Sequence, residues 1–488
     1  MEHKFILRTA SKRTKSTHNL YSMQKKLPKL ITLFGLGFIL ISGTIDLDNL
    51  FGYASQTYPN YINKDNTPGN NAIDNKIATL GRVLFYDKNL SNNNTIACAS
   101  CHQQEFAFGD PAITSTGLNG GQTGRHSMRL INSRFSNEGQ FFWDERATSL
   151  EDQTTKPIQD HVEMGFSGTN GDPDFDGLIT KLSGIDYYET LFEFAYGDVT
   201  INEDRIQRAL AQFIRSIQSF DSKFDIGRGM APNNGQDFTN FTTEENLGKQ
   251  LFLNPPNMGG AGCAGCHQPP EFSIDPNSLN NGIITVAGSA TDTDLTNTRA
   301  PSLRDMVNPN GDLNGPLMHD GSLTTLLEVI NHYNAIPDNT ANTNIDPRLD
   351  PPGPGTQMLN LTDDEKDALV AFLGTLTGTD VYTNEIWSDP FDASGNITLV
   401  GSVLATDEVV FGNGINMYPN PATEYLTIKL EPGNYETYIY DVHGRQHFKK
   451  EISGDDQLMV SKLSKGIYML KIRDKNTGKR YQKKFIKK

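Results

Sequence analysis

Two short stretches decide how this chain is organised: Cys98-Ala99-Ser100-Cys101-His102 and Cys263-Ala264-Gly265-Cys266-His267. Together they contain all four cysteines of the 488 residues, so no cysteine is left for a separate disulfide framework. Each stretch places two thiols about one helical turn apart, directly before a histidine. The chain therefore carries two copies of one chemical site.

The Cys-x-x-Cys-His pattern is typical of covalent haem c. Two thiols at this spacing can form thioethers to the haem vinyl groups while the adjacent histidine coordinates iron. A zinc site or a pair of disulfides is the alternative, and the histidine that ends each copy disfavours it. We therefore predict two covalently bound haem c groups. The predicted attachment residues are Cys98, Cys101, Cys263 and Cys266, and the predicted proximal iron ligands are His102 and His267.

The flanks of the two motifs repeat as well. Residues 80–85 precede the first motif and residues 247–252 precede the second at nearly the same spacing, and both begin with Leu-Gly and end with Leu-Phe. Thr242 and Glu245 form a capping box at the start of the second copy. This self-similarity predicts a duplicated domain.

Helical and β-type patterns divide the chain further. Apolar residues from Ile206 to Phe220 recur at helical spacing and predict a helix that closes the first domain, and Thr362 to Leu376 finishes the second. Gly227 to Asn240, rich in Gly and Asn, is predicted to be a linker. From about Val410, short β-type runs separated by turns predict a small antiparallel sandwich.

These patterns predict a mainly α fold, with two tandem cytochrome c-like haem domains followed by a small C-terminal β-sandwich. The predicted parts are an export segment at 1–45, a first haem domain at 46–226, a second at 241–385, a linker at 386–409 and the sandwich at 410–488.

Composition and the N-terminus exclude other classes of protein. A net charge of −15 argues against nucleic-acid binding, since a phosphate-binding surface needs an excess of Lys and Arg. The one strongly apolar run, Leu30 to Ser42, is shorter than the about 20 residues of a spanning helix. After the basic residues that follow Met23 it has the proportions of a secretory signal. Met1 is the other candidate start, and an uncleaved anchor is the alternative to a cleaved signal.

Several further motifs together resemble the bacterial di-haem cytochrome c peroxidase family and its MauG-like branch, from about Leu80 to Leu376. They are Phe142-Trp143-Asp144-Glu145-Arg146, Glu163-Met164, Ala300-Pro301-Ser302-Leu303-Arg304 and Met318-His319-Asp320-Gly321-Ser322. The resemblance implies reduction of hydrogen peroxide to water. It also implies a small c-type cytochrome or similar donor, with electrons entering at the second haem.

The end of the chain has a second resemblance. Tyr418-Pro419-Asn420-Pro421 and the basic residues 483–488 resemble the type IX secretion sorting domain. This implies secretion machinery as a partner and export to the periplasm, the outer-membrane surface or the medium.

The first resemblance also implies roles for individual residues. Glu163 matches the acid/base that moves a proton between the peroxide oxygens, Gln153 matches the amide that orients peroxide, and Trp143 matches the aromatic between the haems. The alternatives are a solvated loop carboxylate for Glu163 and a plain core aromatic for Trp143. Arg125, Arg146 and Arg304 are candidates for haem propionates, with surface placement as the alternative.

Two positions depart from the family pattern. The distal histidine that blocks the first haem in many members corresponds here to Leu118, so we expect a first haem that is open, with His126 as the nearest surrogate ligand. The family also binds calcium partly through an asparagine where this chain has His126. Carbonyls near Thr298 to Pro301 and waters could still hold one calcium ion.

The sixth ligand of the second haem is predicted to be Tyr333, fourteen residues after His319, where the MauG-like branch has tyrosine. We expect a helix capped by Ser322 on which Leu323, Leu326, Leu327, Ile330 and Tyr333 form one apolar stripe. Met306, Met318, Met358 and His332 are competing ligands. A buried tyrosine satisfied by a hydrogen bond is the alternative.

The sequence therefore favours an exported peroxidase. The rivals are a MauG-like oxidase of a protein or small-molecule substrate and a di-haem electron carrier without turnover. A carrier would keep both irons six-coordinate and would not react with peroxide. A homodimer is left open.

Overall fold

The computed structural model describes residues 43–488 except 137–138, 273–277, 352–354, 402–415, 442–444 and 477–479. The predicted export segment therefore lies almost entirely outside the described residues. In the described ranges, no helix is long and apolar enough to cross a membrane. The α-helices are α1 (Asn75–Tyr86), α2 (Cys98–Cys101), α3 (Leu150–Thr155), α4 (Phe175–Ser183), α5 (Asp186–Tyr196), α6 (Glu203–Ser216), α7 (Lys223–Met230), α8 (Thr243–Leu253), α9 (Leu326–Asn334) and α10 (Asp363–Gly374).

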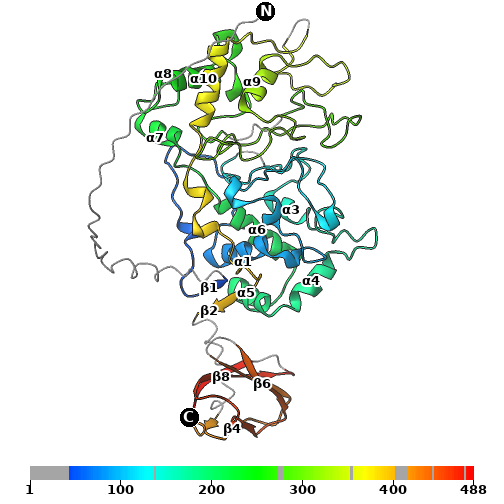
Figure 1. The fold of residues 1–488 in the computed structure, drawn as a ribbon, viewed down its shortest axis with the longest axis vertical. Helices are drawn as coiled ribbons and strands as arrows, with labels where there is room; N and C mark the ends of the chain where they lie inside the picture. Colours follow the sequence, from blue (N-terminus) through cyan, green and yellow to red (C-terminus); the bar gives the residue numbers. More distant parts are fainter. Residues whose placement is uncertain are drawn as a thin grey trace, which may run out of the picture. The chain divides into compact units, whose positions relative to one another are not determined.

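The first hydrophobic core is built around α1 and α6, which lie side by side (Figure 1). The Asp74 side chain caps α1 by accepting the N–H of Lys76 at 2.8 Å. A Cβ added to Gly81 on α1 would lie 2.0 Å from the carbonyl oxygen of Ala209 on α6. Only glycine allows this approach, so Gly81 sets the contact between the two helices.

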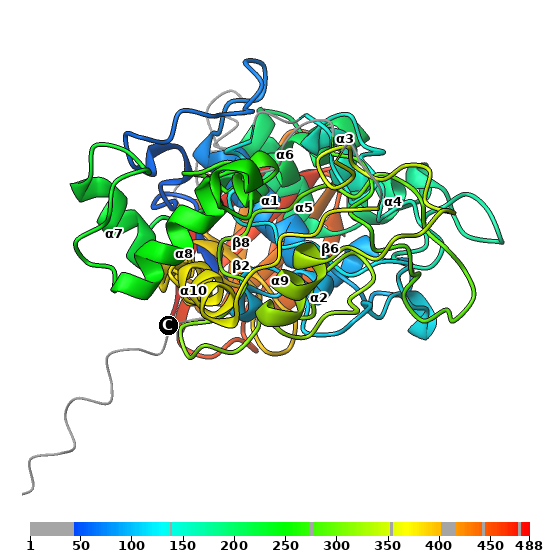
Figure 2. The same cartoon turned by 90° about the horizontal axis from the view of Figure 1, so that it is seen from above.

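The second core repeats this arrangement with α8 and α10, which lie together in Figures 1 and 2. The predicted capping box of Thr242 and Glu245 at the start of α8 is confirmed. A Cβ added to Gly248 would lie 1.9 Å from the carbonyl oxygen of Ala368. The Leu-Gly pair that repeats in the sequence therefore makes the same close helix contact twice.

The aromatic packing next to each glycine also repeats. The rings of Phe85 and Phe213 in the first core are 5.2 Å apart at 56°, and those of Phe252 and Phe372 in the second are 5.2 Å apart at 57°. Equal geometry at equivalent positions of the repeat supports a duplication.

Much of the chain between the helices is irregular. Among the described residues, no α-helix lies between α2 and α3 or between Gly265 and α9. These connections carry most of the residues that line the two cavities described below. A mainly α description of the whole chain is therefore not confirmed.

Two segments that were predicted to be linkers contain packed structure. Gly227 lies inside α7, and Phe238 is 1% exposed in the second core. Trp387 is 2% exposed in the first core and donates its indole N–H to the Ser216 carbonyl at 3.0 Å. The prediction of a linker at Gly227 to Asn240 is wrong, because isolated aromatic residues in a Gly- and Asn-rich segment are enough to anchor it. The wider domain boundaries stay predictions.

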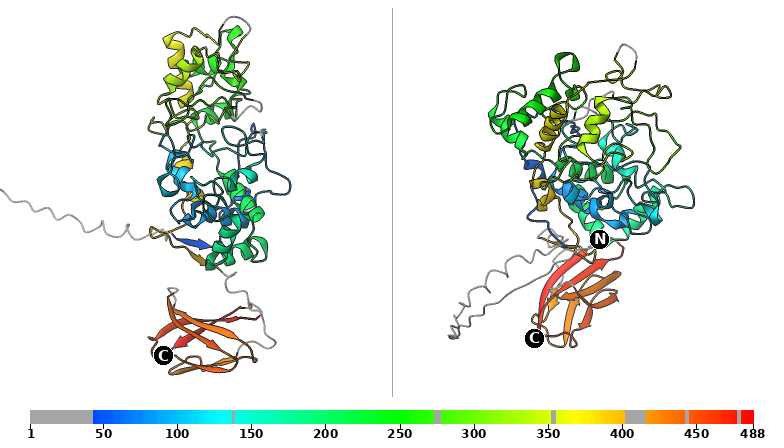
Figure 3. Two further views of the ribbon diagram at one scale, coloured as in Figure 1. Left: turned by 90° about the vertical axis from the view of Figure 1, so that its right-hand side faces the viewer. Right: turned by 45° about the horizontal axis from the view of Figure 1, so that its top comes forward.

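Strand β1 (Thr44–Asp46) pairs in parallel with β2 (Thr398–Val400). Strand β2 lies within the predicted 386–409 linker. The remaining strands form two antiparallel sheets, ordered β3-β4-β7 and β6-β5-β8-β9. Figure 3 shows them as the orange and red strands near the C-terminus. They share one core, with Leu426 and Ile428 from the first sheet and Ile439, Leu470 and Phe485 from the second. The predicted antiparallel sandwich is confirmed. The strands are β3 (Asn416–Tyr418), β4 (Tyr425–Lys429), β5 (Tyr435–Asp441), β6 (Gln446–Ile452), β7 (Asp456–Met459), β8 (Gly466–Asp474) and β9 (Arg480–Lys487).

Candidate active site

The first Cys-x-x-Cys-His motif borders a cavity of about 570 Å³, here called the first cavity. Cys101 and His102 line it, and Cys98 joins them in a smaller hollow of about 60 Å³. Short helix α2 presents both thiols on one turn. Further lining residues of the first cavity are Arg125, Arg129, Trp143, Arg146, Gln153, Pro157, Glu163 and Asp294.

The second motif borders a second cavity, of about 580 Å³. Cys263, Cys266 and His267 line it on one side, and Tyr333 lies on its wall. Most of the remaining wall is apolar, with Leu326, Ile330, Leu369 and Leu373 among its residues. Both cavities have the size of cofactor sites, which commonly measure about 300–1,000 Å³, and the second is also mostly apolar. The residues present therefore fit a haem at each motif.

Both motif histidines are neutral. Burial lowers the pKa of His102 and of His267 to about 4. His102 Nδ1 lies 3.2 Å from the Phe108 carbonyl oxygen, which accepts its proton and leaves Nε2 for a metal. No disulfide joins any of the four cysteines, and burial raises the pKa of Cys98 and Cys263 to about 12. Each motif thus offers two thiols outside any disulfide and one metal-binding imidazole.

Glu163 has the electrostatics of a proton-transfer group. Burial, with a further contribution from the nearby Asp160, raises its pKa to about 7. Asp160 Oδ1 also accepts the backbone N–H of Glu163 at 3.0 Å, which holds the loop in place. Gln153 and Pro157 line the same cavity. The structure therefore brings the predicted residues Glu163 and Gln153 together with His102 in the first cavity.

The segment around Leu118 supports the Glu163 loop. The Leu118 N–H donates to the Val162 carbonyl at 2.7 Å, and a Cβ on Gly117 would lie 2.3 Å from that same oxygen. His102 and His126 are the histidines among the described residues that line the first cavity. His126 Nδ1 lies 3.0 Å from the Ala112 carbonyl oxygen. Whether the first haem is open stays a prediction.

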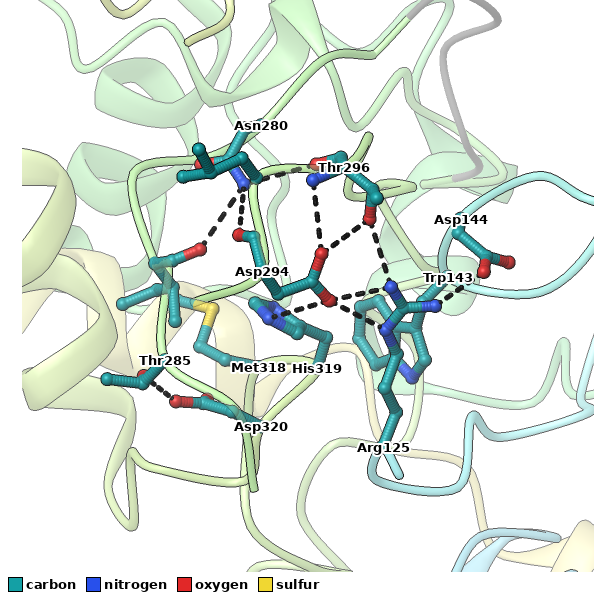
Figure 4. Close-up of polar contacts among 12 residues, drawn as sticks. Arg125, Trp143, Asp144, Asn280, Thr285, Asp294, Thr296, Met318, His319 and Asp320 are labelled. Carbon is teal, nitrogen blue, oxygen red and sulfur yellow. Dashed lines mark hydrogen bonds and ion pairs between the residues drawn. The ribbon is translucent and has the colours of Figure 1, made fainter. Parts of the chain in front are cut away.

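Trp143 lies in the wall that the two cavities share. It is 8% exposed and donates its indole N–H to the His126 carbonyl at 2.7 Å. Its ring packs edge-on against His319, with centroids 6.3 Å apart (Figure 4). This placement supports the predicted position between two haems, which stays a prediction. The residues common to both walls are His126, Ser127, Met128, Arg129, Trp143, Arg299 and Pro301.

The three predicted propionate arginines already have carboxylate partners. Arg125 pairs with Asp144 at 2.7 Å and Asp294 at 2.6 Å, as Figure 4 shows. Arg146 also pairs with Asp144, at 2.8 Å. Arg125 and Arg146 line the first cavity.

Arg304 is placed differently. It is fully buried, pairs with both oxygens of Asp225 and donates to the Pro270 carbonyl. These contacts occupy both terminal nitrogens, so the placement gives no support to a propionate role for Arg304.

Tyr333 lines the second cavity with Met306 and Met318. Burial raises its pKa well above the usual range, and the Asn281 side-chain amide donates to its hydroxyl at 3.4 Å. The same amide lies 3.5 Å from the sulfur of Met318. Tyr333 and these two methionines are therefore the candidate ligands on this wall.

The other two competitors point elsewhere. Met358 is 63% exposed, and His332 Nε2 lies 2.9 Å from the Asn281 carbonyl oxygen. The predicted start of the helix is wrong. Thr325, not Ser322, caps α9 through a capping box with Glu328, so the helix begins at Leu326. Leu327 is 40% exposed and does not belong to the predicted apolar stripe.

The calcium expectation has no direct support. Thr298 and Arg299 donate their backbone N–H groups to the carbonyls of Leu279 and Trp143. Among the described residues, no group of three or more His, Cys, Asp or Glu side chains is arranged to hold a metal ion.

Sequence reasoning missed Arg129, Arg299 and Asn281. Arg129 and Arg299 line both cavities, and Asn281 contacts the ligand candidates of the second. A signal was available for Arg129, because Met128 and Leu130-Ile131 around it make an apolar run that is unusual for a surface arginine.

Comparison with known proteins agrees with this geometry. Residues 75–229 match the family model for di-haem cytochrome c peroxidase, and residues 416–488 match the model for the secretion system C-terminal sorting domain. The crystal structure of a MauG-like protein associated with microbial copper homeostasis superimposes with a TM-score of 0.55 at 29% identity. The match covers 68% of this chain and 98% of that one.

Curated relatives match over a longer stretch of the chain than the di-haem family model does. The methylamine utilization protein MauG of Methylophilus methylotrophus is 30% identical over 324 residues, 64% of this chain and 85% of the relative. Cytochrome c551 peroxidase of Nitrosomonas europaea is 28% identical over 314 residues, 62% of this chain and 80% of the relative. With two haem-binding motifs, two matching cavities and these relatives, the chain belongs to the di-haem cytochrome c peroxidase family that includes the MauG-like proteins.

Proposed function

We propose that this chain is an exported di-haem c-type peroxidase that reduces hydrogen peroxide to water. The observation that carries the proposal is the first cavity, where the Glu163 carboxyl, with a pKa of about 7, and the Gln153 amide share a wall with His102. A small c-type cytochrome or similar protein is the electron donor.

In this proposal the chain is two tandem cytochrome c-like haem domains with largely helical cores, followed by the sandwich. The parts are 46–226 and 241–385 for the two haem domains and 410–488 for the sandwich. Cys98 and Cys101 hold one haem with His102 as its proximal ligand, and the second motif holds the other in the same way. When bound, haem iron supplies the redox centre that exchanges electrons with peroxide and donor. The repeated helix pairs support the tandem arrangement.

Glu163 is the proposed proton carrier. Cleavage of peroxide requires a base that takes a proton from one oxygen and returns it to the other. A carboxyl with a pKa of about 7 can do both near neutral pH, because its two protonation states are almost equally populated. Gln153, on the same wall, orients peroxide through its side-chain amide.

Trp143 is the proposed electron relay. It lies in the wall common to both cavities, and its indole N–H is fixed on the His126 carbonyl. A fixed aromatic ring between two redox sites shortens the distance that each electron must cross.

A second candidate function is a MauG-like oxidase of a protein or small-molecule substrate. Tyr333 on the wall of the second cavity favours it, because an anionic oxygen ligand stabilises the oxidised metal. We propose Tyr333 as the sixth ligand of the second haem whether the protein is a peroxidase or a MauG-like oxidase.

The sorting domain indicates export to the cell surface or beyond. We propose the outer-membrane surface, with the periplasm and the medium as alternatives, and secretion machinery as the partner of residues 410–488. One calcium ion near Thr298 to Pro301 and a homodimer stay predictions, which metal analysis and sedimentation test.

The test is peroxide-dependent oxidation of a reduced c-type cytochrome by the purified, haem-loaded protein. We expect turnover at catalytic concentrations of protein. An electron carrier would exchange electrons with the cytochrome but leave peroxide unconsumed. A MauG-like oxidase would consume peroxide while oxidising an added protein substrate in place of the cytochrome.

A further inference from the structure

Arg129 lies in the wall between the two cavities and lines both of them. The chain makes room for its stem, since a Cβ added to Gly109 would lie 2.9 Å from Cγ of Arg129. The Arg129 side chain therefore lies in the wall that the two proposed haem sites share.

The charge of Arg129 is not matched by the protein. Its Nε is buried without a hydrogen-bond acceptor, and its Nη2 donates to the Ser302 carbonyl at 3.2 Å. Arg215 and Arg304 each pair with a carboxylate within 2.7 Å. Across the described ranges, no ion pair reaches Arg129.

Asp305, whose charge acts on Arg129, does not pair with it. Burial lowers the pKa of Arg129, and Asp305 only partly opposes that shift. Asp305 instead accepts the Gly378 N–H at 2.8 Å and the Tyr382 hydroxyl at 3.3 Å. A guanidinium with a buried Nε and no carboxylate partner is unfavourable, so this wall is suited to bind an anion.

We infer that Arg129 binds a haem propionate at the wall shared by the two cavities. A propionate is a carboxylate, and guanidinium groups bind carboxylates through two parallel N–H donors. The predicted arginines are less suited, because Arg125, Arg146 and Arg304 already pair with aspartates. Arg299, on the same wall with its guanidinium over the Phe141 ring at 4.8 Å, adds a second cation. The inference rests on the proposed function only in placing haem in both cavities.

The test uses the haem-loaded full chain with Arg129→Met. Resonance Raman spectra report the propionate bending bands, and a redox titration reports both midpoint potentials. We expect one propionate band to move to lower frequency, because a hydrogen-bonded ion pair is lost. The midpoint potential of the same haem should fall, because loss of a nearby positive charge stabilises ferric iron.

A matched control and a second variant complete the design. Arg134→Met removes the same charge five residues away, where the partner is Asp65 at 2.6 Å, and should leave both readouts unchanged. Arg129→Lys keeps the charge and should retain the potential, but its single ammonium should still shift the band. It serves as the test if Arg129→Met does not load haem.

Unchanged propionate bands and potentials in the Arg129 variants would overturn the inference, whatever happens to turnover. A wild-type protein that carries two haems but does not consume peroxide would overturn the proposed function instead. Its Raman comparison with the variants would still decide the role of Arg129.

Discussion

At the residue scale, Glu163 combines burial with a nearby acid, and both effects favour its protonated form. Its pKa of about 7 lies above the usual 4.5 of a glutamate. Below about pH 7 most molecules carry the protonated carboxyl, which cannot accept the first proton of peroxide. We therefore expect the rate constant for reaction with peroxide to rise as pH increases through about 7.

Glu163→Gln should lower peroxide turnover by ~10²–10⁴, the usual weight of a positioned proton-transfer group, and should flatten the pH profile. Steady-state turnover and stopped-flow absorbance between pH 5 and 9, roughly the range over which this group titrates, measure both. Glu105→Gln is the matched control, because Glu105 is exposed in the same domain. Near-normal turnover of Glu163→Gln would assign proton transfer to another group.

Tyr333 is the second residue whose proposed role predicts a measurable property, the ferric spectrum of the second haem. If its oxygen is the sixth ligand, the ferric spectrum lacks the methionine charge-transfer band near the red edge. Tyr333→Met should create that band and raise the potential of the second haem, since a thioether favours ferrous iron. A wild-type spectrum with the band would make Met306 or Met318 the ligand, and Met318→Leu would then distinguish them.

At the element scale, two glycines control how closely the core helices approach. Gly248→Ala would place a methyl group 1.9 Å from the Ala368 carbonyl oxygen, so α8 and α10 must separate. We expect a loss of about 1–3 kcal/mol in the free energy of unfolding, as for other overpacked cores. Denaturant unfolding of the haem-loaded protein measures it.

Gly229→Ala in α7 is the control for this change. A Cβ there meets nothing within 4 Å, so the gain in helix propensity should make it neutral or slightly stabilising. Equal effects at Gly248 and Gly229 would show that the helix contact is less tight than the backbone positions imply.

The loop that carries Leu118 makes a prediction about activation. Its backbone is pinned to the Glu163 loop, and its side chain offers no metal ligand. We expect a high-spin first haem in the fully oxidised protein and reaction with peroxide without prior reduction. Electron paramagnetic resonance of the oxidised protein measures the spin state. A low-spin bis-histidine signal from that haem would contradict the expectation and point to His126.

At the scale of the whole molecule, the two motifs are equivalent in sequence but not in surroundings. The first cavity has Glu163 and Gln153 on its wall, whereas the second is mostly apolar and carries Tyr333. Replacing Cys98 and Cys101 by alanine should remove one haem and abolish peroxide turnover. Replacing Cys263 and Cys266 should remove the other haem and block oxidation of the donor.

Haem content by pyridine haemochrome and turnover with peroxide check both double variants. Haem staining after denaturing electrophoresis should show two covalent groups in the wild type and one in each variant. A wild-type chain that contains zinc and no haem would contradict the prediction of two haem sites.

The sequence by itself determined the covalent chemistry, because thiol and imidazole spacing along the chain is a local property. Cys98 to His102 and Cys263 to His267 needed no fold to be recognised. The repeated Leu-Gly pairs and four strands of the sandwich, β4, β5, β8 and β9, could also be read from the sequence, since period and turn residues are local. Strands β3, β6 and β7 were missed, β6 because its exposed, charged residues have no apolar alternation.

Only the tertiary structure decided which charges share a wall. Arg304 and Arg129 look alike in sequence, yet one meets Asp225 and the other meets no carboxylate among the described residues. Trp143 lies between the cavities because a loop of the first domain meets residues 298–303 of the second. Such contacts join positions 79 or more residues apart, and burial at each of them depends on the whole packed chain, which no local pattern records.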